Sequence, residues 1–138
     1  MPRPVRETLI FPRLYCCLGL LLLLIAPLSA AGDLTVHLAG TEPFTRRVID
    51  YQCDALGASL GLPASRFSVE YLNSDSNSLA ILPVAGRSLI FVSVISASGA
   101  RYAAQRYIWW EAAGRSITFS ADSPLGHQQT SCRRVEGH

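Results

Sequence analysis

The stretch FSVEYLNSDSNSLAILPVAGRSLIFVSVI, residues 67–95, carries the pattern that decides the fold. FSVEYL (67–72) alternates apolar with polar residues, which predicts a strand with one buried face. SLAILPV (78–84) and SLIFVSVI (88–95) are more continuously apolar, as expected of strands covered on both faces. Pro83 favours a sheet edge for the first of these two, because proline donates no hydrogen bond to a neighbouring strand. The stretch therefore predicts three consecutive short strands.

The connections and the flanking sequence repeat this pattern. Turn-forming residues fill NSDSNS, VAGR, EAAGR and ADSPLG (73–78, 84–87, 111–115 and 121–126). Further short alternating runs are LTVHL, VIDYQC, RYIWW and SITFS (34–38, 48–53, 106–110 and 116–120), with Ile117 and Phe119 expected to face inward. About seven or eight short strands at roughly 8–12-residue spacing indicate an antiparallel sandwich or barrel. We expect a small closed or nearly closed all-β barrel, with residues 54–65 able to hold a helical turn.

Residues 1–31 have the composition of a cleaved secretory signal peptide. Three arginines against one acid precede the apolar run CLGLLLLLIAPL, and the small residues of SAAG allow cleavage after Ala31. A retained membrane anchor is the competing interpretation, but the apolar run is short for a membrane span. Cys16 and Cys17 lie at the start of the apolar run and not after it, and so do not mark a lipoprotein. We expect residues 32–138 to form a single domain in the periplasm without a membrane anchor.

The charge balance excludes several classes of partner. The chain has 12 lysine and arginine residues, all of them arginine, against 10 aspartate and glutamate residues. Without the leader, arginines and acids are equal in number, so the net charge is near zero. A nucleic-acid-binding protein needs a basic surplus, and none is present. Diffuse attraction to a membrane surface is equally unsupported.

Two cysteines, Cys53 and Cys132, remain after the leader. An even number in an exported domain predicts a disulfide, which would close a loop of roughly 80 residues and stabilise the fold by about 4–5 kcal/mol. Zinc is the alternative, but the sequence has no CxxC pair, and His37, His127 and His138 lack ligand spacing. We therefore expect neither a metal site nor another cofactor.

Catalytic patterns are absent from the sequence. There is no GxSxG, GxxxxGK[ST] or GxGxxG motif. Glu70 and Glu111 would be the obvious carboxylate pair for a glycosidase, but we interpret both as solvated charges on a strand and in a loop. The protein is therefore expected to act by binding and not as an enzyme.

An ordered set of features resembles a known family. VIDYQCDALG (48–57) is followed by the meander of residues 67–84, then SASGARY (96–102), then Trp110 and a single late cysteine. Over residues 48–134 this resembles the bacterial c-type lysozyme inhibitors, which include membrane-bound and periplasmic members. The resemblance implies an eight-stranded barrel held by a disulfide. It also implies a non-enzymatic protein whose SGxRY loop enters the cleft of a c-type lysozyme, contacts its catalytic acids and protects peptidoglycan.

The resemblance assigns roles to the lysozyme-binding loop, Ser98, Gly99, Ala100, Arg101 and Tyr102. Ser98 matches the inserted serine, whose hydroxyl both donates and accepts hydrogen bonds. Gly99 allows a close backbone approach. Arg101 can make charge-assisted contacts to a carboxylate. Tyr102 either contributes to the contact surface or packs beneath the loop.

The chain departs from the family at a second contact loop. Where the family has a lysine two residues after the tryptophan, this chain has Ala112, and Arg115 is a candidate source of the missing charge. Two other functions therefore stay open: an envelope structural or interaction module of the same fold, and a glycan-binding module that uses Trp109 or Trp110 for stacking. The sequence leaves the oligomeric state and the particular lysozyme undetermined.

Overall fold

The computed structural model describes residues 32–39, 43–113 and 116–136. The chain divides into two units, Met1–Ala39 and Gly40–His138. In the first unit, the described residues 32–39 contain neither strand nor helix, so the strand predicted at 34–38 is wrong. Alternation alone does not make a strand, because strands are stabilised by pairing with a neighbour. The predicted signal peptide lies outside the described residues, and no helix within them has the length and hydropathy to span a membrane.

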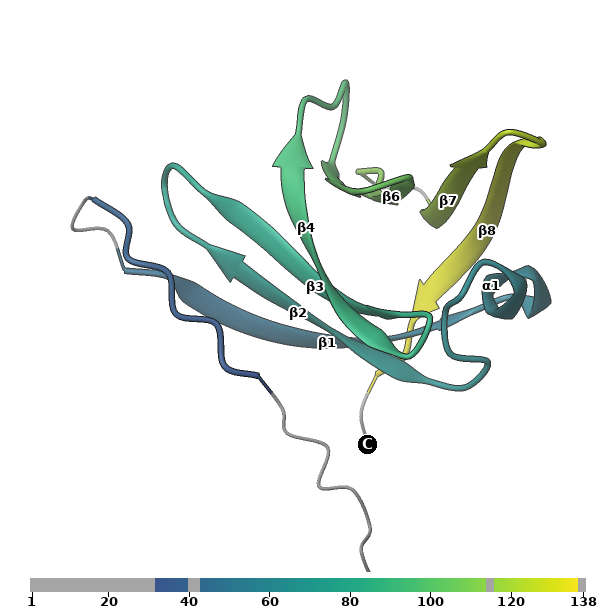
Figure 1. The fold of residues 1–138 in the computed structure, drawn as a ribbon, viewed down its shortest axis with the longest axis horizontal. Helices are drawn as coiled ribbons and strands as arrows, with labels where there is room; N and C mark the ends of the chain where they lie inside the picture. Colours follow the sequence, from purple (N-terminus) through teal and green to yellow (C-terminus); the bar gives the residue numbers. More distant parts are fainter. Residues whose placement is uncertain (1–31, 40–42, 114–115, 137–138) are drawn as a thin grey trace, which may run out of the picture. The chain divides into compact units, whose positions relative to one another are not determined.

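The second unit is an antiparallel barrel that closes in chain order (Figure 1). β1 pairs with both β2 and β8, so the first and last strands form the seam. The eight strands in the described residues are β1 (Thr45–Cys53), β2 (Phe67–Asn73), β3 (Ser78–Val84), β4 (Arg87–Val94), β5 (Ala100–Ala104), β6 (Tyr107–Glu111), β7 (Ile117–Ser123) and β8 (Gly126–Arg134). The predicted eight-stranded barrel is confirmed.

β5 is the strand that the sequence pattern did not reveal. Residues 100–102 were expected to lie in the lysozyme-binding loop, but they belong to a strand that pairs with β4 on one side and β6 on the other. The loop between β4 and β5 is therefore only residues 95–99. The segment is short and rich in alanine, which has a low strand propensity, so it is held in the sheet by its neighbours.

Aromatic side chains fill the barrel interior. Tyr51, Phe91, Trp109 and Phe119 are all fully buried. The ring of Tyr51 meets that of Trp109 edge-on, with centroids 5.0 Å apart. The inward face predicted for FSVEYL is confirmed by the burial pattern of β2, and Ile117 and Phe119 of SITFS pack in the core as predicted. On β7 the alternate residues Thr118 and Ser120 are buried as well, so that strand is covered on both faces.

The outer face of β4 meets solvent, contrary to the expectation that this strand is covered on both faces. Ile90 and Val92 are 43% and 55% exposed. A barrel has a single sheet, so within the described part of the chain the outside of β4 stays uncovered. Pro83 is accommodated without a sheet edge, because the pairing of β3 with β2 ends at Ile81.

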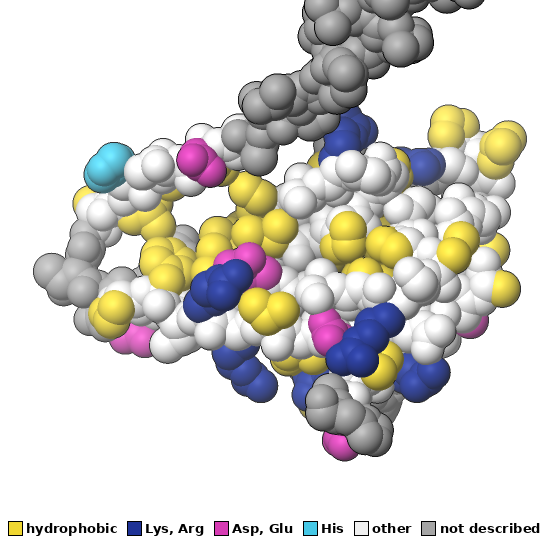
Figure 2. Space-filling view, turned by 90° about the horizontal axis from the view of Figure 1, so that it is seen from below, with side chains coloured by type: hydrophobic (Ala, Val, Ile, Leu, Met, Phe, Trp, Pro, Cys, Tyr) yellow, Lys and Arg dark blue, Asp and Glu magenta, His cyan; other side chains and the backbone are white. Residues whose placement is uncertain are grey.

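On the face drawn in Figure 2, apolar side chains lie beside adjacent arginine and acidic side chains.

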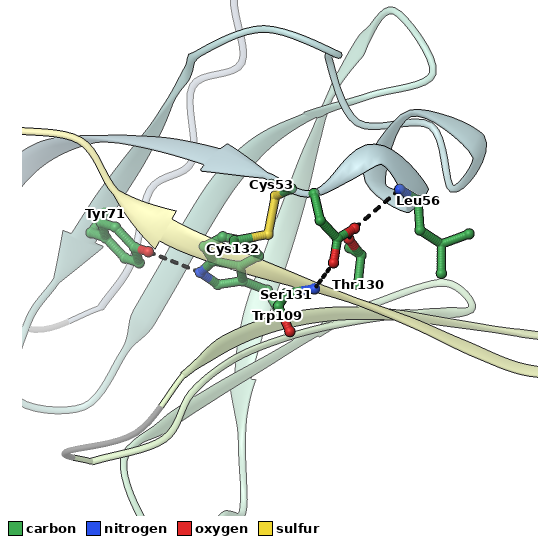
Figure 3. The surroundings of a disulfide bond; sticks show 8 residues. Cys53, Leu56, Tyr71, Trp109, Thr130, Ser131 and Cys132 are labelled. Carbon is green, nitrogen blue, oxygen red and sulfur yellow. Dashed lines mark hydrogen bonds between the residues drawn. A yellow bond between two sulfur atoms is a disulfide. The ribbon is translucent and has the colours of Figure 1, made fainter.

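A disulfide joins Cys53 to Cys132 across the seam, where they are register partners of β1 and β8 (Figure 3). The helix α1 (Ala55–Ser59), in the region expected to hold a helical turn, begins immediately after it. Asp54 caps α1 by accepting from the Leu56 amide at 3.0 Å, and it also accepts from the Ser131 amide at 3.1 Å. The carboxylate therefore fastens α1 to β8 beside the disulfide, and the predicted bridge is confirmed.

Candidate functional site

The order of the strands gathers the predicted contact segments at one end of the barrel. In an antiparallel barrel closed in chain order, the connections that follow even-numbered strands lie at the same end. The β4–β5 loop (residues 95–99), the segment after β6 and the end of β8 therefore lie at one end. The ribbon shows the chain projecting beyond the tip of β4 (Figure 1).

The β4–β5 loop is exposed, yet its backbone is held from two sides. The hydroxyl of Ser96 donates to the carbonyl oxygen of Ser98 at 2.7 Å, and Nε1 of Trp110 donates to the same oxygen at 3.0 Å. Trp110 lies on the outer face of β6 and is half-buried, whereas Trp109 is fully buried inside. Neighbouring residues of a strand face opposite sides of the sheet, so one tryptophan packs in the core and the outer one fixes the loop.

Gly99 is required at its position for two reasons. Its φ is +68°, in the left-handed region that favours glycine. A Cβ built there would lie 1.9 Å from the carbonyl oxygen of Glu111 and 2.7 Å from the backbone nitrogen of Ala113. The β4–β5 loop therefore packs backbone against backbone on the segment that follows β6.

The structure divides the remaining predicted loop residues between two surfaces of β5. Arg101 is exposed on the outer face, whereas Tyr102 is 5% exposed in the interior, with its ring 5.9 Å from that of Tyr71. Ala100 is half-buried and packs against the core. The structure thus leaves Ser98, Gly99 and Arg101 accessible to a partner and places Tyr102 beneath the loop.

The second predicted contact segment lies beside the first. Ala112 is half-buried, and its Cα would be 2.9 Å from a Cβ at Gly99. Arg115 lies outside the described residues. The two predicted segments are therefore neighbours, at least as far as Ala113.

Glu111 is not a solvated loop charge, contrary to the interpretation from the sequence. It is the last residue of β6, faces inward, and accepts hydrogen bonds from Tyr51 at 2.7 Å, from Tyr71, and from Arg134 at 2.9 Å. Tyr71 in turn accepts a hydrogen bond from Nε1 of Trp109 at 2.9 Å, which Figure 3 shows. Continuing the alternation of Tyr107 and Trp109 by two residues would have placed Glu111 inside.

This network alters the acidity of its members. Burial raises the pKa of Glu111, but the hydrogen bonds from Tyr71, Tyr51 and Arg134 lower it by more, so its pKa lies below that of a free glutamate. Burial, with the nearby carboxylate, raises the pKa of Tyr51 to about 12 and that of Tyr71 further. Glu111 is therefore an anion held by neutral phenols and one guanidinium. Glu70 lies on the opposite face of the sheet, paired with Arg46, so the two glutamates do not form a carboxylate pair.

A comparison with protein families matches residues 51–123, from within β1 to the end of β7, to the membrane-bound lysozyme-inhibitor of c-type lysozyme, MliC. The chain belongs to the MliC family. The predicted family is thus confirmed, and the family consists of inhibitors, which bind an enzyme and are not themselves enzymes.

Two curated relatives are described as membrane-bound lysozyme inhibitors of c-type lysozyme. The one from Pseudomonas aeruginosa is 46% identical over 74 residues, which are 53% of this chain and 52% of the relative. The one from Cupriavidus necator is 45% identical over 64 residues, which are 46% and 45% of the two chains. The chain spans about half the length of the curated relatives it matches.

A solved structure extends the likeness to the MliC fold. It is the crystal structure of Pseudomonas aeruginosa MliC in complex with hen egg white lysozyme. The match has a TM-score of 0.59 and 36% identity, and it covers 77% of this chain and 99% of the other. The likeness therefore extends over most of this chain and nearly all of the MliC chain.

Proposed function

We propose that the protein inhibits c-type lysozyme by inserting the β4–β5 loop and the start of β5 into the cleft of the enzyme. The observation that carries this proposal is the likeness to a protein crystallised with hen egg white lysozyme, at 36% identity over 99% of that chain. The exposed, braced loop is the segment of this chain that the family resemblance assigns to the lysozyme cleft.

The chemistry of the loop fits the target. Lysozyme cleaves its glycan with two carboxyl groups, one protonated and one ionised. The hydroxyl of Ser98 can donate to one and accept from the other, and the guanidinium of Arg101 can pair with an ionised carboxylate. The bonds from Ser96 and Trp110 fix the loop before binding, so less conformational entropy is lost in the complex.

The cell envelope is the proposed site of action. The family name supports a location at a membrane, and the leader pattern of residues 1–31 supports export to the periplasm. An inhibitor there would intercept lysozyme before it reaches peptidoglycan.

The test is a titration of the oxidised protein into hen egg white lysozyme acting on bacterial cell walls. Stoichiometric loss of lysis is expected. The double variant Ser98→Ala with Arg101→Ala should stay folded and lose about tenfold or more in affinity, since it removes two contacts to charged groups. The matched control is Arg87→Ala with Ser88→Ala, an exposed pair at the opposite end of the barrel. Equal inhibition by the two double variants would remove the loop from the mechanism.

A further inference from the structure

An open groove lies at the end of the barrel, beside the place where the β4–β5 loop packs on the segment after β6. Gly99 and Ala112 are among the residues that line it. Among its described lining residues the charged groups are Glu111 and Arg134. Neither residue belongs to the two contact segments predicted from the sequence.

The two charges are satisfied to very different extents. The side chain of Glu111 is 17% exposed, and both of its oxygens are used, by two phenols and the guanidinium. The side chain of Arg134 is 54% exposed, and its contact to Glu111 uses one Nη2 donor at 2.9 Å. A guanidinium has five N–H donors in a fixed fork. Arg134 therefore presents further donors to the groove while Glu111 holds it in place.

A second arginine adds to the positive charge at this end of the barrel. Arg47, which is exposed, lines a small adjoining pocket of about 100 Å³ together with Arg134, Glu111, Tyr71 and Tyr102. Two arginines against one carboxylate leave a formal excess of positive charge among these residues. Their arrangement favours an anion.

We propose that this groove is a carboxylate subsite, in which Arg134 receives a carboxylate of the bound lysozyme beside the inserted loop. This inference rests on the proposed function. Glu111 is a positioning residue, because it orients the guanidinium without touching the partner. A planar guanidinium can hold a carboxylate through two parallel hydrogen bonds, which strengthen when binding excludes water.

The test compares two adjacent arginines of β8 that point in opposite directions. Arg134→Gln keeps hydrogen-bond donors toward Glu111 but removes the charge. Arg133→Gln is the matched control, since Arg133 is exposed and bonds the side chain of Gln52 at 2.6 Å. Affinity for hen egg white lysozyme should fall about tenfold or more in the first variant and stay within about twofold in the second. The affinity of Arg134→Lys should lie between those of the two glutamine variants, because lysine keeps the charge but cannot make two parallel hydrogen bonds.

Two further measurements separate binding by Arg134 from an effect on folding. Thermal unfolding of each variant shows whether the barrel is intact. A double-mutant cycle pairs Arg134→Gln with lysozyme variants in which single acids of the cleft are replaced by amides; the effects should be non-additive for one acid.

Three results would overturn parts of the proposal. Equal affinity of the Arg134→Gln and Arg133→Gln variants would refute the subsite while leaving inhibition by the loop in place. Additive effects for every acid of the cleft would refute a direct carboxylate contact. Failure of the unaltered protein to bind lysozyme would overturn the proposed function and the subsite with it.

Discussion

A Cβ atom on Gly99 would lie 1.9 Å from the carbonyl oxygen of Glu111, so the β4–β5 loop and the end of β6 fit together only with glycine at position 99. Gly99→Ala is expected to push the loop away from β6 and weaken lysozyme inhibition by about tenfold or more, since a preorganised surface is lost. A lysis titration measures this effect.

The same substitution has a matched control at another turn. Gly86 also has a positive φ, +72°, but a Cβ there would meet no atom within 4 Å. Gly86→Ala therefore suffers backbone strain alone, about 1 kcal/mol in urea unfolding, and should inhibit normally. Gly99→Ala should lower the free energy of unfolding by more than Gly86→Ala does. An equal loss in the two variants would show that the backbone near Glu111 moves aside without destabilising the barrel.

Trp110→Phe tests the bond from the indole to the loop. The variant removes the donor to the Ser98 carbonyl at 3.0 Å but keeps an aromatic ring on the outer face. Barrel stability should change by about 1 kcal/mol or less, while affinity for lysozyme falls about three- to tenfold because the loop is less ordered. Trp109→Phe removes the hydrogen bond to Tyr71 in the core. It should lower the free energy of unfolding by more than Trp110→Phe does. A reversed ranking in denaturant unfolding would contradict these assignments.

Stability should depend on pH through Glu111. Its pKa is lowered in the folded state, so in acid the unfolded chain binds more protons and the free energy of unfolding falls. The contribution is complete above the ordinary glutamate pKa of about 4.3 and is lost as the pH drops through the folded-state value. Glu111→Gln should flatten this part of the acid limb. The pKa values of Asp50 and Asp54 are also lowered, chiefly by hydrogen bonds from Ser68 and Thr130 respectively. These two groups should account for the loss of stability in acid that the variant still shows.

The alkaline limb has the opposite sign. The pKa of Tyr51 is raised to about 12, so its contribution is complete below the ordinary phenol pKa of about 10 and is lost as the pH rises through 12. Unfolding followed by circular dichroism between pH 3 and 12 would record both limbs. A curve for Glu111→Gln that superimposes on that of the unaltered protein would show that the network does not control stability.

Removal of the disulfide should destabilise the barrel without changing its surface. Cys53 and Cys132 are 79 residues apart in sequence, and a loop of this size corresponds to about 4–5 kcal/mol of chain entropy. Cys53→Ala with Cys132→Ala should lower the midpoint of urea unfolding accordingly. The unaltered protein should show the same loss when a reductant is added, and the double variant should not respond to it. A response of the double variant would assign the effect to something other than this bridge.

The sequence predicted those features that follow from alternation and from counting cysteines. The inward faces of β2 and β7, the barrel class and the seam disulfide were all evident from residue patterns. The brace from Trp110 was not evident, because a bond to a loop carbonyl has no sequence pattern.

Three features escaped prediction for identifiable physical reasons. LTVHL alternates but has no strand partner in the described residues, whereas the alanine-rich segment 100–104 is a strand because β4 and β6 flank it. Glu111 was assigned to solvent because a carboxylate is costly to bury, and only its three donors, distant in sequence, make the inner position favourable. Each error arose where the presence or absence of a partner distant in sequence outweighed local preference.

The seam between β1 and β8 also constrains how the molecule is assembled. One edge of β1 stays unpaired until the last strand is in place, because Gly126–Arg134 supplies the only partner that β1 has besides β2 in the described barrel. Until then the growing sheet has two open edges, which can recruit other chains. Closure depends on a contact of very high sequence separation, so it is expected to be a late and slow event. A chain that stops before β8 would remain an open sheet prone to association.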